Sequence, residues 1–175
     1  VCRILFVGQV NGFGMCNLLS CLTAHAMNPR LETIARIRNP EYTEQIMTMR
    51  KVFPLSNKRE DTIIGGISMG GFGSLINGMR FHETFGHIVA ISPALVKYDI
   101  ASSTDEPNPV GATRGFFASV FGDLDKYPES ENNPAVLAAR LKAEGAQFPS
   151  IYLACGKNDM LVMPARALHA DLLKL

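Results

Sequence analysis

The segment TIIGGISMGGFGSL, residues 62–75, places Ser68 among small residues directly after an apolar run. Short β-branched runs that end in glycine are typical of buried strands, and an apolar stretch after the turn favours a helix. A flexible linker would instead repeat its glycines among polar residues. The segment therefore predicts a strand over 62–66, a sharp turn at Ser68 and a helix over 70–81.

Short apolar runs alternate with helical patterns along much of the chain. The stretch EYTEQIMTMRKVF carries an apolar stripe at helical spacing, and the proline after it ends the helix. Asn133-Pro134 is a helix cap and Gly145 a helix end. The predicted elements are strands over 3–8, 86–92 and 149–155, and helices over 41–53, 135–144 and 163–175. This alternation predicts an α/β fold, a parallel sheet with helices on both faces.

The composition fits one domain and excludes several classes of protein. The chain has 175 residues, 47% of them hydrophobic and 19% charged, with a net charge of +1. Such a balance favours a globular core over disorder, and no basic block indicates nucleic-acid binding. No run reaches the roughly 18 apolar residues of a membrane span. The four cysteines lack zinc-ligand spacing, which predicts no metal and favours a reducing cytoplasm.

The segment 94–132 is rich in Pro, Gly, Ser and Asp around the apolar island RGFFASVFG. It has the length of a functional loop rather than of an ordinary connection. We therefore expect a lid-like excursion over one edge of the sheet. Its phenylalanines, Phe116, Phe117 and Phe121, either line a pocket or anchor the segment to the core.

Gly66-Ile67-Ser68-Met69-Gly70 matches the pattern G-x-S-x-G at a strand-to-helix junction. A serine that projects its hydroxyl above the sheet needs a strained, very tight turn, and residues two before and two after it have no room for a Cβ atom. The helix that follows presents free N–H groups, which makes the Met69 N–H a candidate oxyanion donor. The alternative is that these glycines serve only close packing.

A catalytic serine needs a base to take its proton and an acid to orient that base. Where the serine lies on a G-x-S-x-G turn between a strand and a helix, the acid, Asp or Glu, follows it in the chain and the histidine comes last. Asp159 follows the predicted strand 149–155 and is the candidate acid. An aspartate in a loop is also a common turn former. Glu144 and Asp171 are rivals that lie in or beside helices.

The histidines do not fit this order. His25 precedes the serine, His82 and His87 follow it too closely, and His169 lies inside the last predicted helix. We therefore expect the base to be absent from this chain.

From Tyr42 to Leu175 the sequence resembles the esterase D and S-formylglutathione hydrolase-like group of α/β-hydrolases, and within it bacterial tributyrin or acetyl esterases. The resemblance rests on VFPLSNKREDTIIGGISMGGFGSL, FGHIVAISPAL, FGDLDKYPE and YLACGKNDML. It implies Ser68 as nucleophile, the Met69 N–H as oxyanion donor and Asp159 as acid, with the histidine in a loop after one more strand. It further implies a small-molecule ester substrate of short acyl chain, no cofactor or metal, and no nucleic-acid or membrane partner; homo-oligomerisation stays open.

Residues 1–40 diverge from this family pattern. The family has His-Gly after its early strand, where the next residue gives a second oxyanion N–H; ILFVGQVNGFG offers only Gly8 and, weakly, Gln9. We therefore expect residues 1–175 to form a single, partial α/β-hydrolase domain, incomplete at both ends.

Two other functions remain open. Gly8, Gly12 and Gly14 resemble the cofactor loop of dinucleotide-binding oxidoreductases, although no tyrosine is followed four positions later by a lysine. The chain would alternatively be an inactive hydrolase fragment. With one triad member missing, we expect slow or absent turnover of short acyl esters.

Overall fold

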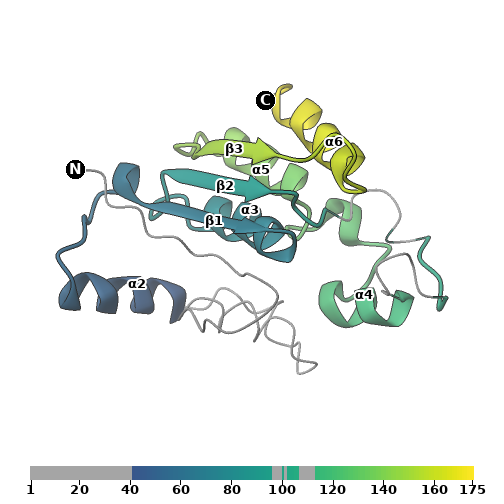
Figure 1. The fold of residues 1–175 in the computed structure, drawn as a ribbon, viewed down its shortest axis with the longest axis horizontal. Coiled ribbons are helices and arrows are strands. Elements are labelled where there is room, and N and C mark those ends of the chain that lie inside the picture. The colour runs from purple at the N-terminus through teal and green to yellow at the C-terminus, as the bar shows by residue number, and fades with distance from the viewer. Residues whose placement is uncertain (1–40, 96–99, 101, 107–112) are drawn as a thin grey trace.

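A computed structural model describes residues 41–95, 100, 102–106 and 113–175 of the chain. Its centre is a three-stranded sheet in the order β1 (Ile63–Ile67), β2 (His87–Ile91) and β3 (Ser150–Ala154). Both strand pairs are parallel, with Ile67 opposite Ile91 and Ile91 opposite Ala154 (Figure 1). All three strands therefore end at the same edge of the sheet, called the carboxyl edge below. The predicted α/β class and these strands are confirmed.

Three helices pack together as a layer on this sheet: α3 (Met69–Arg80), α5 (Pro134–Ala143) and α6 (Val162–Leu172). Helix α3 lies against β1 and β2, α6 contacts β3, and α5 packs between α3 and α6 (Figure 1). The helices predicted over 70–81, 135–144 and 163–175 are thus present, with ends that differ by a few residues.

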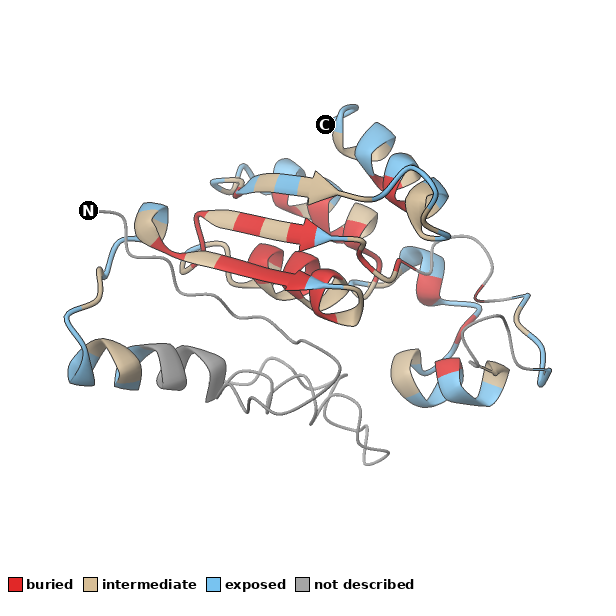
Figure 2. Ribbon diagram, viewed as in Figure 1, coloured by how far each residue is buried: buried red, intermediate tan, exposed pale blue. Residues whose placement is uncertain are grey.

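The core lies between the sheet and this helical layer. Alternate strand residues, Ile64 on β1 and Ile88 and Ala90 on β2, face the helices and are buried with Leu75 and Met79 of α3. Successive strand side chains point to opposite faces, so this alternation selects one face of the sheet for burial. Figure 2 shows the buried residues concentrated in β1, β2 and α3.

The opposite face of the sheet carries exposed apolar side chains. Ile67, Ile91 and Tyr152 are 49%, 37% and 62% exposed. The register places these residues on the face that points away from Ile64 and Ile88.

The amino edge of the sheet is tied together by Arg59, which precedes β1. Its Nε donates to the His82 carbonyl at 2.7 Å, and its Nη2 donates to the carbonyls of Phe85 at 3.3 Å and Gln147 at 3.2 Å. Helix α2 (Glu41–Val52), predicted over 41–53, is joined to this edge by a 2.8 Å hydrogen bond from Arg50 Nη2 to Thr62 Oγ1.

The apolar island of the segment 94–132, RGFFASVFG, forms a helix that the sequence did not predict, α4 (Arg114–Phe121). Thr113 caps the helix by accepting from the Phe116 N–H at 3.2 Å. Phe117 packs into a second, small cluster of buried residues with Ile100, Leu124 and Tyr127. The segment therefore has its own core.

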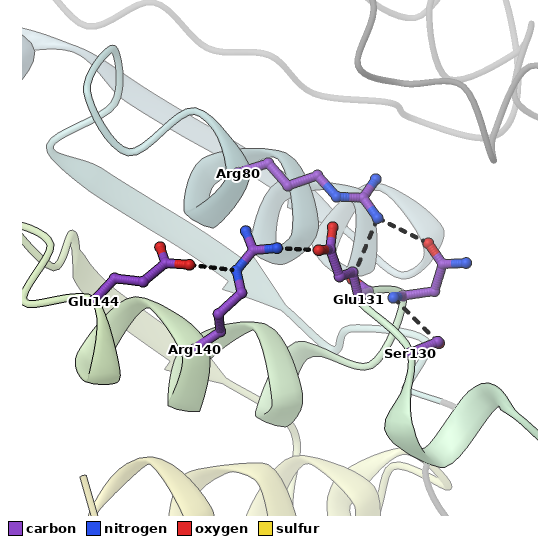
Figure 3. A network of polar contacts seen from close by, with 6 residues as sticks. Arg80, Ser130, Glu131, Arg140 and Glu144 are labelled. Atoms are coloured by element: carbon purple, nitrogen blue, oxygen red, sulfur yellow. Dashed lines mark hydrogen bonds and ion pairs between the residues drawn. The ribbon is translucent and has the colours of Figure 1, made fainter.

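A polar network joins the end of α3 to the start of α5 (Figure 3). Arg80 donates to Asn132 Oδ1 at 3.0 Å and to the Glu131 carbonyl at 3.3 Å, while Arg140 pairs with Glu131 and Glu144. Partial burial lowers the pKa of Arg80 from its usual value. Pairs this exposed contribute about 0–1 kcal/mol each, so the network orients the two helices more than it stabilises them.

The start of α5 confirms the predicted cap. Asn133 Oδ1 accepts from the Ala135 N–H at 3.1 Å, and Pro134 occupies the first helical position. Gly145 follows the helix with a φ of 66°, the left-handed conformation that favours glycine.

None of the helices that the structure describes has both the length and the apolar content needed to cross a membrane. The strand predicted over 3–8 and the glycines Gly8, Gly12 and Gly14 lie outside the described residues, as do Gln9 and His25. The domain boundaries stay a prediction.

Candidate active site

Ser68 stands between the end of β1 and the start of α3 in a conformation rare for an L-residue. Its φ is 57° and its ψ is −120°. Conformations of this kind cost about 1–3 kcal/mol and persist only where the surroundings impose them. Two contacts do so: the Ser68 N–H donates to the Ile91 carbonyl at 3.0 Å, and the Ser68 carbonyl accepts from the Phe72 N–H at 3.0 Å. The sharp turn predicted at this serine is confirmed.

Two glycines make the turn sterically possible. A Cβ atom on Gly66 would lie 2.4 Å from the carbonyl carbon of Gly70, so the two chain segments meet backbone to backbone. A Cβ atom on Gly71 would lie 3.1 Å from Gly66 O, Ile91 O and Pro93 Cα. The close approach predicted for Gly66 and Gly70 is therefore present, and Gly71 adds a further close contact that the sequence pattern does not contain.

The Ser68 hydroxyl does not cap α3, the helix that follows it. A serine at this cap position usually accepts a hydrogen bond from the first helical turn, but the Ser68 side chain makes no such bond. The first intrahelical acceptor is the Ser68 carbonyl, so the N–H groups of Met69, Gly70 and Gly71 have no acceptor within the helix. These N–H groups and the positive end of the α3 dipole thus lie next to Ser68, which is half-buried.

Asp159 follows β3 at the same carboxyl edge. Its N–H donates to the Gly156 carbonyl at 3.0 Å, which closes a tight turn, and its Oδ1 accepts from the Leu161 N–H at 2.9 Å. This backbone donor, followed by hydrogen bonds from the Ser92 and Cys155 side chains, lowers the pKa of the Asp159 carboxyl from its usual value. An aspartate is ionised at neutral pH at its ordinary pKa, and these donors stabilise the charged form further.

Ser92 lies between these two residues, at the end of the middle strand, and sequence reasoning missed it. Its φ is 39°, and its N–H donates to the Ala154 carbonyl at 2.7 Å. The signal in the sequence was Pro93, which directly follows Ser92, the last residue of the strand predicted over 86–92. A serine before proline is compatible with an ordinary turn, so only the backbone angle distinguishes it.

The other ionisable candidates lie elsewhere. Glu144, directly after α5, pairs with Arg140, and Asp171, on α6, pairs with Lys174. His87 begins β2 at the amino edge, where its Nε2 lies 2.9 Å from the Glu60 carbonyl, and His82 follows the distal end of α3. His169 is exposed on α6. Within the described ranges, no histidine follows a strand at the carboxyl edge.

The aromatic residues of the excursion reach α3 close to the turn. Phe121 of α4 packs edge-on against Phe72 at 5.9 Å between ring centroids and against Tyr127 at 4.9 Å. Phe117 is 8% exposed, whereas Phe116 is 38% exposed. Phe117 and Phe121 therefore anchor the excursion, which leaves Phe116 as the side chain available to a ligand.

No three His, Cys, Asp or Glu side chains gather closely enough to hold a metal ion in the part of the chain that the structure describes.

Three comparisons with known proteins identify the family. Residues 45–171 match the family described as "Putative esterase". An acetyl esterase of Caldicellulosiruptor saccharolyticus is 41% identical over 125 residues, which are 71% of this chain and 47% of that protein.

Solved structures agree with this match. An S-formylglutathione hydrolase from Staphylococcus aureus aligns with a TM-score of 0.60 and 26% identity over 75% of this chain and 49% of its own. A fluorophosphonate-binding serine hydrolase from Staphylococcus aureus, solved with bound substrate, also aligns with a TM-score of 0.60. It is 28% identical, and the alignment covers 77% of this chain and 49% of that protein. The chain thus spans about half the length of these proteins. It belongs to the esterase family of α/β-hydrolases.

Proposed function

We propose that the protein is a serine carboxylic-ester hydrolase that acts on short-chain acyl esters. Ser68 is the nucleophile, the Met69 N–H donates to the oxyanion, and Asp159 is the acid of the triad. The observation that carries the proposal is the turn at Ser68: its φ is positive, and its hydroxyl makes no capping hydrogen bond to the start of α3. Family membership supports ester hydrolysis as the reaction class.

The reaction follows from these positions. Ser68 Oγ attacks the ester carbonyl while a histidine accepts its proton, and charge develops on the carbonyl oxygen. One preorganised N–H at such an oxygen is worth roughly 3 kcal/mol of barrier, and the start of α3 offers that of Met69. The histidine gives the proton that it took from Ser68 to the leaving alcohol, and the acyl group stays on Ser68 Oγ. Water, deprotonated by the same histidine, then attacks the acyl carbonyl, which releases the carboxylic acid and returns the proton to Ser68.

The base is the member that the described residues do not supply. Asp159 would orient an imidazole through the N–H that faces it and stabilise the imidazolium that forms. We assign this histidine to a position outside the described residues.

The small acyl group is supported by two relatives whose names carry acetyl and formyl groups. Phe116 is a candidate for the acyl wall. The free Cys155 thiol beside Asp159 favours a reducing cytoplasm as the compartment.

The test is hydrolysis of p-nitrophenyl esters by the chain and by Ser68→Ala, with and without added imidazole. We expect slow acetyl transfer to Ser68. Above the rate of imidazole alone, imidazole should accelerate hydrolysis by the wild-type chain but not by Ser68→Ala, because a free base replaces the missing one. Rates should fall from acetyl through butyryl to octanoyl esters.

Equal rates for the wild-type chain and Ser68→Ala, with imidazole present, would rule out Ser68 as the nucleophile. Equal rates on the three esters would rule out a small acyl site. Brisk turnover without imidazole, lost in Ser68→Ala, would place the base within the chain.

A further inference from the structure

The chain that leaves β2 cannot continue the regular hydrogen bonding of the sheet. In a parallel ladder, a residue that donates to one position of its neighbour accepts from the residue two positions further on. The Ser68 N–H donates to the Ile91 carbonyl at 3.0 Å, so a regular ladder would have the Ser68 carbonyl accept from residue 93. Residue 93 is proline, which has no N–H group. The ladder therefore lacks its donor at the carbonyl of the candidate nucleophile.

The Ala94 N–H takes that place. It donates to the Ser68 carbonyl at 2.9 Å, one residue later than in a regular ladder. Ser92, with a φ of 39°, leaves the extended backbone of β2 just before the proline. A residue before proline prefers an extended backbone, so this conformation is disfavoured locally and is held by the surrounding structure. The bend brings the N–H of Ala94 to the position where Pro93 has none.

The corner formed by residues 91–94 lies directly against the first turn of α3. Pro93 is fully buried, and a Cβ atom on Gly71 would lie 3.1 Å from its Cα. Leu95 packs in the core, and its N–H donates to the Pro93 carbonyl at 2.8 Å, which closes a three-residue turn centred on Ala94. Packing and this turn therefore hold the Ala94 N–H in place.

The Ser68 carbonyl shares its peptide unit with the Met69 N–H, the candidate oxyanion donor. The unit is planar and trans, so its C=O and N–H groups point in opposite directions. The carbonyl accepts from the Ala94 N–H at 2.9 Å and from the Phe72 N–H at 3.0 Å, which uses both of its lone pairs. Because the carbonyl is fixed toward the corner and the helix, the Met69 N–H is fixed away from them.

Two donors on the carbonyl also strengthen the N–H at the other side of the peptide unit. Hydrogen bonds linked in this way polarise one another, by about 10–30% per bond. Stabilisation of a developing oxyanion depends on donors that are already oriented and need no reorganisation during the reaction. A Met69 N–H that is directed and polarised in advance meets this requirement.

We propose that Ala94 is a positioning residue for the oxyanion donor: its N–H holds the Ser68 carbonyl and thereby directs the Met69 N–H of the same peptide unit. This role rests on the proposed function, because it concerns the donor that stabilises the charge formed during attack by Ser68. The role belongs to the backbone N–H of Ala94 and not to its methyl group. Ala94 itself does not touch the substrate.

The first test detects the hydrogen bond without catalysis. NMR of deuterated chain labelled with ¹⁵N and ¹³C measures the coupling that passes through a hydrogen bond, from the donor nitrogen to the acceptor carbonyl carbon. We expect this coupling between the Ala94 nitrogen and the Ser68 carbonyl carbon. The reference is the Ala146 N–H, which donates to the Leu141 carbonyl at 3.0 Å. A coupling at Ala146 without one at Ala94 would overturn the proposal, whichever residue is the nucleophile.

The second test removes the N–H and keeps the side chain. Replacement of Ala94 by L-lactic acid, introduced by nonsense suppression, exchanges the N–H for an ester oxygen. The same exchange at Ala146 is the matched control, because it removes a backbone hydrogen bond of similar length beside Gln147, at the amino edge of the sheet. Ala94→Pro removes the same N–H with an encoded residue, and the negative φ of a three-residue turn suits proline.

The readout is imidazole-assisted acetylation of Ser68 by p-nitrophenyl acetate and by its thionoester, in which sulfur replaces the carbonyl oxygen. Sulfur is a weak hydrogen-bond acceptor, so the thionoester gains little from the Met69 N–H. Because a misdirected donor costs less than a removed one, we expect roughly a tenfold loss with the acetate in both Ala94 variants. The thionoester rates should change little, and the Ala146 ester should react with both substrates as the wild type does.

Equal losses with the two substrates would contradict the positioning role, because a general distortion of the Ser68 turn slows both. Wild-type rates with the acetate in folded Ala94 variants would contradict it as well. Absence of acetylation in the wild-type chain would instead refute the proposed function. The coupling measurement would then still decide whether the Ala94 N–H holds the Ser68 carbonyl.

Discussion

Gly66 is the position where a single methyl group should do the most damage to the turn at Ser68. In Gly66→Ala the new Cβ would lie 2.4 Å from the Gly70 carbonyl carbon and 2.5 Å from its oxygen. Carbon atoms in contact lie about 3.5–4.0 Å apart, so roughly 1 Å of movement is needed. The obstructing atoms are backbone, so the first turn of α3 must shift, and Ser68 with it.

The cost of this shift can be estimated. Overpacking of a tight interior costs about 1–3 kcal/mol. For a protein of this size, each 1 kcal/mol lowers the unfolding midpoint by about 2–4 °C. A displacement of about 1 Å at a reacting group can cost on the order of a hundredfold in rate. We therefore expect Gly66→Ala to melt several degrees lower and to acetylate Ser68 about a hundredfold more slowly.

Gly73→Ala is the matched control within the same segment. Gly73 lies inside α3, and a Cβ built on it meets no atom within 4 Å other than those of its chain neighbours and the helix's own backbone. Alanine is favoured over glycine in a helix by about 1 kcal/mol, so this variant should melt slightly higher than the wild type. Circular dichroism at 222 nm suits both measurements, since the chain has no tryptophan. A Gly66→Ala protein as stable and reactive as the wild type would refute the close-approach argument.

Three further variants test the backbone strain and the charges. Ser68→Gly should unfold at a higher temperature than Ser68→Ala, because glycine adopts a φ of 57° without strain, and both variants should lose acetylation. Equal unfolding temperatures for the two variants would contradict the strain at Ser68. The Asp159 pKa is lowered on folding, so its stabilisation is present above the unfolded value of about 3.9 and is lost as the pH falls further. The urea midpoint difference between wild type and Asp159→Asn should therefore narrow below pH 4, and a constant difference would contradict this. Burial raises the pKa of Tyr127, so the free energy of unfolding should fall as the pH rises above about 10. In Tyr127→Phe, which has no phenol to ionise, the free energy of unfolding should fall less over the same pH range.

The sheet and the turn at Ser68 were predictable because local sequence determines them. The apolar run before Ser68 ends in glycine, and the residues that follow it suit a helix better than a second strand. The same reasoning located Asp159, since the carboxyl ends of parallel strands share one edge. The lowering of its pKa below the usual value was not predictable, because the Leu161 N–H that causes most of it depends on a loop geometry that no pattern records.

The helix α4 and the conformation of Ser92 were not predictable for a related reason. The residues around the island RGFFASVFG favour loops, and its helix is stabilised by Phe117 packing on Ile100, Leu124 and Tyr127, which lie apart in the sequence. The positive φ of Ser92 is likewise imposed by its hydrogen bond to β3 and the contact of its turn with Ser68. Tertiary contacts determined both features.

The identity of the residue that a serine-directed reagent modifies is the most direct test of the proposed mechanism. The chain would be treated with a fluorophosphonate ester, which phosphonylates activated serines, in the presence of imidazole, and the modified peptide sequenced by mass spectrometry. We predict one adduct per chain, on Ser68, that disappears when the protein is unfolded in urea before labelling. An adduct on a different serine, or equal labelling of folded and unfolded chain, would contradict the claim that the bend between β1 and α3 activates this hydroxyl.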